Sequence, residues 1–88
     1  MTEKDVIRQA MALRKWSFPT MVGVMEEKGI RGVKGAFTAS NLSGFMNNNE
    51  NGIRFDNFFK MLSAMDCEIV IKDKHHNKEW KIDMKQEK

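Results

Sequence analysis

The sequence predicts a small, mainly α-helical domain in which four helices are followed by a C-terminal β-hairpin. Within residues 3–65, four segments have apolar residues at spacings of three and four, which is typical of amphipathic helices. From Ile69 onward this period changes to two, with a β-branched run at 69–71 and strict alternation at 79–84. At 88 residues, the chain has room for one domain, so we expect residues 1–88 to fold as a single unit.

The first two helices are predicted from their capping residues. Thr2 is a good N-cap with Asp5 three residues on, and we expect a helix over residues 3–16. Its apolar stripe is formed by Val6, Ile7, Ala10, Met11 and Leu13. Ser17 begins the second helix, and Pro19 is tolerated in the first turn. This helix carries Met21, Val22 and Met25 inward, and Gly29 ends it.

Two further helices follow a glycine-containing segment. Residues 30–37 have no clear period and are predicted to be a loop. Thr38 is the next N-cap, and we expect a short helix over 39–47. Its inward residues are Leu42, Phe45 and Met46. After a turn-prone run at 47–52, a helix over 54–65 is predicted. Its core stripe is Phe55, Phe58, Phe59, Leu62 and Met65, and Asp66 is expected to adopt the left-handed conformation after it.

Residues 67–84 are predicted to form the β-hairpin, with a frayed tail at 85–88. The expected register places Ile71 opposite Ile82, Ile69 opposite Met84, and Lys72 beside Lys81. Because an isolated hairpin is marginally stable in water, its apolar face must cover the helices or a second copy of itself. The candidate dimer residues on that face are Ile69, Ile71, Trp80, Ile82 and Met84.

The composition excludes several classes of protein. Lys and Arg total 15 against 12 Asp and Glu, and the excess lies within residues 1–35, so an anionic partner is permitted. A single cysteine, Cys67, excludes an intramolecular disulfide and a multi-cysteine zinc site. His75 and His76 are expected to be turn residues, and we expect no metal and no cofactor. No apolar run suits a membrane span and the N-terminus does not resemble a signal peptide, so a cytoplasmic protein is expected.

The segment around Thr38 carries the functional signal. A short helix with small polar residues outside is what docking in the DNA major groove needs. The Thr38 hydroxyl and the first amides of the helix are suited to a phosphate. The side chains expected to reach base edges or phosphates are Ser40, Asn41, Ser43, Asn47 and Asn48, with Arg31 and Lys34 of the preceding loop as further phosphate contacts.

Residues 38–47, 53–65 and 17–22 together resemble a lambda-repressor-like (Xre-type) helix-turn-helix domain. The resemblance covers about residues 5–66, and the hairpin is similar to an extension of some phage and mobile-element regulators. It implies a helical core over 3–66 and a reading helix over 39–47. By position, it implies base contacts from Ala39, Ser40 and Gly44, and backbone or flanking contacts from Thr38, Asn41 and Ser43.

The sequence departs from that pattern in two places. The connection between the second and third helices is several residues longer than the usual tight turn, and the side chains of Ala39 and Gly44 cannot hydrogen-bond a base. Specificity is then expected from Ser40 and Asn41, from DNA shape, or from the inserted loop.

We therefore expect a sequence-specific DNA-binding transcription regulator of the repressor kind. It would bind double-stranded DNA as a homodimer and place two copies of the 39–47 helix in successive major grooves. An enzyme is not expected, because the sequence shows no set of nucleophile, base and oxyanion donors. The alternative is a protein-interaction module on the same fold, such as an antitoxin-like or anti-repressor partner. RNA binding is disfavoured, because no exposed aromatic stacking platform is evident.

Overall fold

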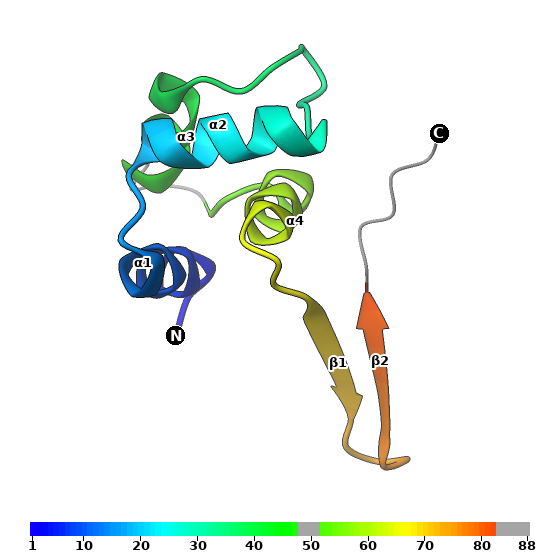
Figure 1. Cartoon of the computed structure of the whole chain (residues 1–88). Helices are drawn as coiled ribbons and strands as arrows, with labels where there is room; N and C mark the ends of the chain where they lie inside the picture. Colours follow the sequence, from blue (N-terminus) through cyan, green and yellow to red (C-terminus); the bar gives the residue numbers. More distant parts are fainter. Residues whose placement is uncertain (48–51, 83–88) are drawn as a thin grey trace.

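The computed structural model describes residues 1–47 and 52–82 of the chain. Four helices come first: α1 (Glu3–Arg14), α2 (Phe18–Lys28), α3 (Ala39–Asn47) and α4 (Phe55–Ala64). An antiparallel hairpin of β1 (Ile69–Asp73) and β2 (Lys78–Ile82) follows them (Figure 1). The predicted fold class, four helices and then a hairpin, is confirmed. No helix in these two ranges is long and apolar enough to cross a membrane.

The helix ends follow the predicted capping residues closely. Thr2 and Asp5 form a reciprocal capping box at α1, in which each side chain accepts the other's backbone N–H at 3.1–3.2 Å. Ser17 caps α2 by accepting the Thr20 N–H. Helix α1 ends at Arg14, two residues earlier than predicted, because Lys15 turns into the left-handed conformation with φ 59°. Gly29 ends α2 in the same conformation with φ 72°.

The core lies where the four helices meet and is rich in methionine. Ile7 of α1, Met21 of α2, Leu42 of α3 and Met61 of α4 have no exposed surface. Six methionines among the described residues are buried: Met11, Met21, Met25, Met46, Met61 and Met65. Unbranched thioether side chains fill irregular gaps, which suits a core between short helices that cross at different angles.

Two predicted core residues lie on the surface instead. Leu13 is 83% exposed, because the buried stripe of α1 runs through Ile7, Ala10 and Met11. Phe55 is 60% exposed, and its ring stacks on Phe59 with 5.8 Å between centroids. The buried stripe of α4 lies further along the helix than predicted, at Met61, Leu62 and Ala64.

Two basic side chains tie the end of α4 to the earlier helices. Lys28, the last residue of α2, donates to the carbonyls of Ser63 and Ala64 and pairs with Asp66 at 2.7 Å. The same hydrogen bond from Lys28 holds the pKa of Asp66 below its ordinary value. Arg14 donates to the Met65 carbonyl at 2.8 Å. Carbonyls at a helix C-terminus have no intrahelical partner, so these two cations satisfy them and favour the helix dipole.

The hairpin register differs from the predicted one by two residues. Ile69 pairs with Ile82 and Ile71 with Trp80, so the predicted pairing of Ile71 with Ile82 is wrong. The cause is the turn: the Asp73 carboxylate accepts the backbone N–H groups of His75 and His76 at 3.0 and 3.3 Å. Asn77 closes this turn in the left-handed conformation with φ 57°.

The shifted register also changes the charged face of the hairpin. Lys72 lies opposite Glu79, 3.8 Å away, instead of beside Lys81 as predicted. Lys81 pairs with Glu68 at the same distance. A shift of two residues keeps every side chain on its predicted face, so Ile69, Ile71, Trp80 and Ile82 still share one side. Met84, the fifth residue predicted for that side, lies outside the described residues.

The hairpin projects away from the helices, as Figure 1 shows. Only its base is held, where Ile69 packs against the core and the Cys67 N–H donates to the Leu62 carbonyl. Further out, Ile71 is 47% exposed and Trp80 49%. The sequence analysis left two possible packing partners for the apolar face, the protein's own helices or a second copy. The helices cover only the base of this face.

Candidate nucleic-acid interface

A reciprocal capping box fixes the start of α3. Thr38 donates its N–H to Asn41 Oδ1, and Asn41 donates its N–H to Thr38 Oγ1, both at 3.1 Å. Thr38 was predicted as the cap, whereas the returning bond from Asn41 was not. Because the Asn41 side-chain oxygen already accepts the Thr38 N–H, its amide NH₂ is the group left without a partner among the described residues. Two-point recognition of adenine by this residue would require its oxygen to accept a second hydrogen bond or the capping bond to open.

The outward face of α3 consists of small, uncharged residues. Leu42 and Met46 are buried, which turns Ser40, Gly44 and Asn47 to the outside, all exposed. Ala39 and Ser43 are half-buried at the edges of this face, so Ala39 is poorly placed for base contact. Asn47 donates its amide to the Ser43 hydroxyl at 3.0 Å. Asn48, also predicted to contact DNA, lies outside the described residues.

Gly44 leaves open space on this face. A Cβ built at Gly44 meets no atom within 4 Å, so internal packing does not require glycine there. Glycine inside a helix destabilises it by about 1 kcal/mol relative to alanine. Gly23 in α2 is equally open and is therefore a matched position outside α3. At Gly44 the backbone of α3 is accessible from outside at the centre of its polar face.

Residues 32–35 form a tight two-residue turn where the sequence predicted a loop. Gly32 and Gly35 exchange backbone hydrogen bonds of 2.8 and 3.2 Å, with Val33 and Lys34 at the tip. Gly35 has φ 124°, which favours glycine. A Cβ on Gly32 would lie 3.2 Å from the Phe37 ring. Gly35 is therefore needed for the turn, and a side chain at Gly32 would require the Phe37 ring to shift slightly.

The turn is coupled to α3 through two aromatic rings. Phe37 is buried at the base of the turn, and its ring meets that of Phe45 on α3 edge to face, with centroids 6.2 Å apart. Arg31 and Lys34, the two predicted phosphate contacts, are both exposed. The packing of Phe37 on Phe45 thus fixes a basic turn at the flank of an uncharged helix.

Two further cations near α3 were not singled out from the sequence. Arg54 immediately precedes α4 and lies beside the turn, paired with Asp56 at 3.3 Å. Arg8 of α1 donates to the Met46 carbonyl at 3.3 Å, near the other end of α3. Their positions in the sequence did not indicate that they lie near α3, because only the fold brings α1 and α4 close to it. Basic side chains therefore lie around α3, while α3 itself contains none.

The hairpin strands β1 and β2, which carry the described residues predicted for the dimer, lie apart from α3 (Figure 1). Within the described ranges, no cluster of three His, Cys, Asp or Glu side chains is suited to a metal ion. Comparisons with protein-family models, with curated proteins and with solved structures gave no match for this chain.

Proposed function

We propose that this protein binds double-stranded DNA and inserts α3 into the major groove. The observation that carries the proposal is the outward face of α3, where Ser40 and Gly44 serve neither packing nor capping. The major groove is about 12 Å wide and admits one helix, and small side chains allow the closest approach to base edges. Ser40 is the best-placed direct reader, because its hydroxyl both donates and accepts.

Phosphate contacts would come from the surroundings of α3. Amides in the first turn of a helix have no intrahelical partner, and the helix dipole favours an anion there. Arg31 and Lys34 supply positive charge on one flank. Neutralising phosphates with lysine and arginine releases counterions, so we expect the affinity for DNA to fall as salt rises.

We further propose that two copies associate through the hairpin. Its apolar face is half exposed at Ile71 and Trp80, whereas the charges of the other face pair within the hairpin, Lys72 with Glu79 and Lys81 with Glu68. Joining two apolar faces removes them from water and leaves the paired charges outside. A twofold dimer would present two α3 helices to one DNA duplex and would read a palindrome with half-sites about one helical turn apart.

A regulator of the repressor kind, related to the lambda-repressor-like helix-turn-helix proteins, is the function that these features support best. A dimer bound at a specific site blocks access of other proteins to that DNA, and the chain needs no cofactor for it. A protein with this role would act in the cytoplasm.

The alternative, a protein-interaction module without DNA readout, is favoured by one observation. Phe55 is exposed and stacks on the half-buried Phe59 of α4, while the outward face of α3 carries no charge. An exposed aromatic side chain is a common anchor in protein interfaces. A module of this kind would show no salt-sensitive affinity for DNA.

The test is retention of random-sequence duplexes by the full chain at about 50 and 200 mM salt, followed by sequencing. Enrichment of a palindrome, with retention lost at high salt, supports the dimeric reader. Ser40→Ala should then change the selected sequence. Retention without enrichment supports phosphate-driven binding alone. No retention at low salt contradicts the proposal and favours the protein-interaction module.

A further inference from the structure

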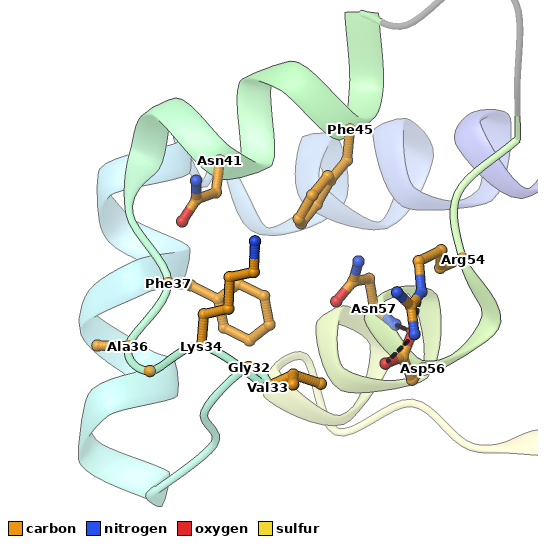
Figure 2. Close-up of a pocket in the computed structure, with 11 residues that line it drawn as sticks. Gly32, Val33, Lys34, Ala36, Phe37, Asn41, Phe45, Arg54, Asp56 and Asn57 are labelled. Carbon is orange, nitrogen blue, oxygen red and sulfur yellow. Dashed lines mark hydrogen bonds and ion pairs between the residues drawn. The ribbon is translucent and has the colours of Figure 1, made fainter.

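A cavity of about 410 Å³ opens between the 32–35 turn, the flank of α3 and the start of α4. Figure 2 shows Asn41 and Phe45 pointing from α3 toward the turn, while Lys34 extends from the turn toward α3. The Phe37 ring lies behind Lys34, and Asn57 faces the same space from α4. Apolar surface from two aromatic rings thus adjoins polar groups from three separate elements.

The polar groups of this cavity are mostly hydrogen-bond donors. Lys34 makes no hydrogen bond or ion pair with any other described residue, so its ammonium is free for a ligand. Asn41 keeps its amide NH₂, because its oxygen accepts the Thr38 N–H. Arg54 is already neutralised by Asp56. The lining therefore carries one net positive charge, with the unpaired cation beside an aromatic wall.

We propose that this cavity binds a small aromatic carboxylate. The ring of such a ligand would pack against Phe37 and Phe45, where aromatic rings attract one another edge to face. Its carboxylate would meet the Lys34 ammonium, with the Asn41 amide as a second donor. The volume lies within the range of small-molecule sites and holds one or two fused rings.

Ligand and DNA would compete, a consequence that rests on the proposed DNA-binding function. Lys34 is both the cation of this cavity and a phosphate contact of the proposed interface, and a carboxylate bound to it removes that positive charge from DNA. Because binding linkage is reciprocal, DNA would weaken the ligand by the same factor. The site would then release the protein from DNA when an aromatic acid accumulates.

The experiment titrates the free, ¹⁵N-labelled full chain with indole-3-acetate and, separately, with its neutral isostere indole-3-acetamide. We expect saturable binding of the acid with a dissociation constant of about 1 mM or tighter. Amide signals of Gly32, Gly35 and Phe45 should shift most. The acetamide should bind about fivefold more weakly, because it lacks the charge that Lys34 attracts.

Lys34→Gln and Lys74→Gln give a matched pair of variants. Both remove one exposed lysine from a turn, but Lys74 lies in the hairpin turn, outside this cavity. Lys34→Gln should weaken the acid about fivefold and leave the acetamide unchanged, whereas Lys74→Gln should alter neither.

Three results would overturn the proposal: no saturable binding of the acid, equal binding of the acetamide, or shifts confined to residues outside the cavity. Because these titrations contain no DNA, they succeed or fail separately from the proposed DNA-binding function. Adding the selected duplex afterward tests the competition alone.

Discussion

Thr38 and Ser40 lie two residues apart at the start of α3, yet only the Thr38 side chain is hydrogen-bonded to another described residue. Thr38 exchanges two hydrogen bonds with Asn41 and so fixes the first turn of the helix. The Ser40 hydroxyl is exposed and has no partner among the described residues. Residues of similar size and polarity therefore divide into one that maintains the fold and one that is available for a ligand.

Substitution at these two positions should separate stability from DNA binding. Thr38→Val removes the capping hydroxyl and should lower the free energy of unfolding by about 1 kcal/mol. Ser40→Ala should change that free energy by less than about 0.5 kcal/mol but weaken DNA binding about fivefold or more. Urea denaturation and a fluorescence-based affinity measurement check the two effects. Loss of stability in Ser40→Ala would contradict the assignment.

Gly44 gives a steric test of groove docking. Gly44→Leu and Gly23→Leu each add a side chain at an exposed, open helical position, so both should stabilise the fold by about 0.5–1 kcal/mol. In the proposed complex, only Gly44→Leu would place that side chain between α3 and the bases. It should weaken DNA binding at least about tenfold, whereas Gly23→Leu should leave it unchanged. Equal affinity for DNA in the two variants would show that the α3 face does not approach DNA closely.

At the scale of single elements, the proposed dimer requires that one face of the hairpin, the apolar one, forms the contact between the two copies. Val70 and Ile71 are neighbours on β1 with opposite orientations and nearly equal exposure, 43% and 47%. Val70 lies among the paired charges, whereas Ile71 lies against Trp80 on the apolar face. Because Val70 and Ile71 are similarly exposed but lie on opposite faces, substituting each in turn shows which face of the hairpin is needed for association.

Ile71→Lys should dissociate the dimer, because it places a charge in the proposed interface without a partner. Val70→Lys adds the same charge to the already charged face and should leave the dimer intact. Sedimentation equilibrium of both variants and of the parent protein measures the association. A parent protein that is monomeric at the concentration where it binds DNA would contradict the dimer.

The hairpin turn should make stability depend on pH in the acid range. Hydrogen bonds from the His76 side chain and the His75 N–H lower the pKa of Asp73 below its ordinary value. A carboxyl whose pKa is lowered by folding stabilises the fold above its unfolded pKa, about 3.9, and that contribution is lost as pH falls through its folded pKa. Hydrogen bonds from Thr2 lower the pKa of Asp5 in the same way.

Thermal unfolding between about pH 6 and pH 2 measures this dependence. Asp73→Asn keeps the hydrogen-bond acceptor but removes the titration, so its melting temperature should fall less steeply below pH 4 than that of the parent. Identical slopes for the two proteins would show that Asp73 contributes nothing through its charge.

Structural features that depend on neighbouring residues were predictable from the sequence, whereas features that depend on packing between distant elements were not. The caps at Thr2, Ser17 and Thr38 and the left-handed Gly29 and Asp66 depend on a few neighbouring residues, and the structure has each of them as predicted. The hairpin register was wrong because Asp73 closes the turn with its side chain, so the four-residue loop begins one residue earlier than predicted.

The placement of residues in the core and the site depended on how elements pack. Helical period alone put Phe55 inside, whereas the crossing of α4 with its neighbours buries the stripe through Met61 instead. For the same reason, the cations of the 31–34 segment could be singled out from the sequence, whereas nothing in it associated Arg54 with them. The outward face of α3 was predictable because it follows from one helix and its cap.

At the scale of the whole molecule, the fold separates two surfaces. The helical body carries α3 with basic residues on its flanks, and the hairpin extends from the end of α4 on the other side (Figure 1). A dimer joined by the hairpins would leave both α3 helices free. The small size of the domain also favours association, since an 88-residue chain buries a modest core.

The central claim is that the outward face of α3 contacts DNA, and amide mapping by NMR tests it most directly. The ¹⁵N-labelled full chain is titrated with a duplex taken from the selection, at low salt. We predict that the largest shifts fall on Ser40, Gly44 and the 31–34 turn, and that those of β1 stay small. Shifts centred on Phe55 and Phe59, or no shifts at all, would contradict the account.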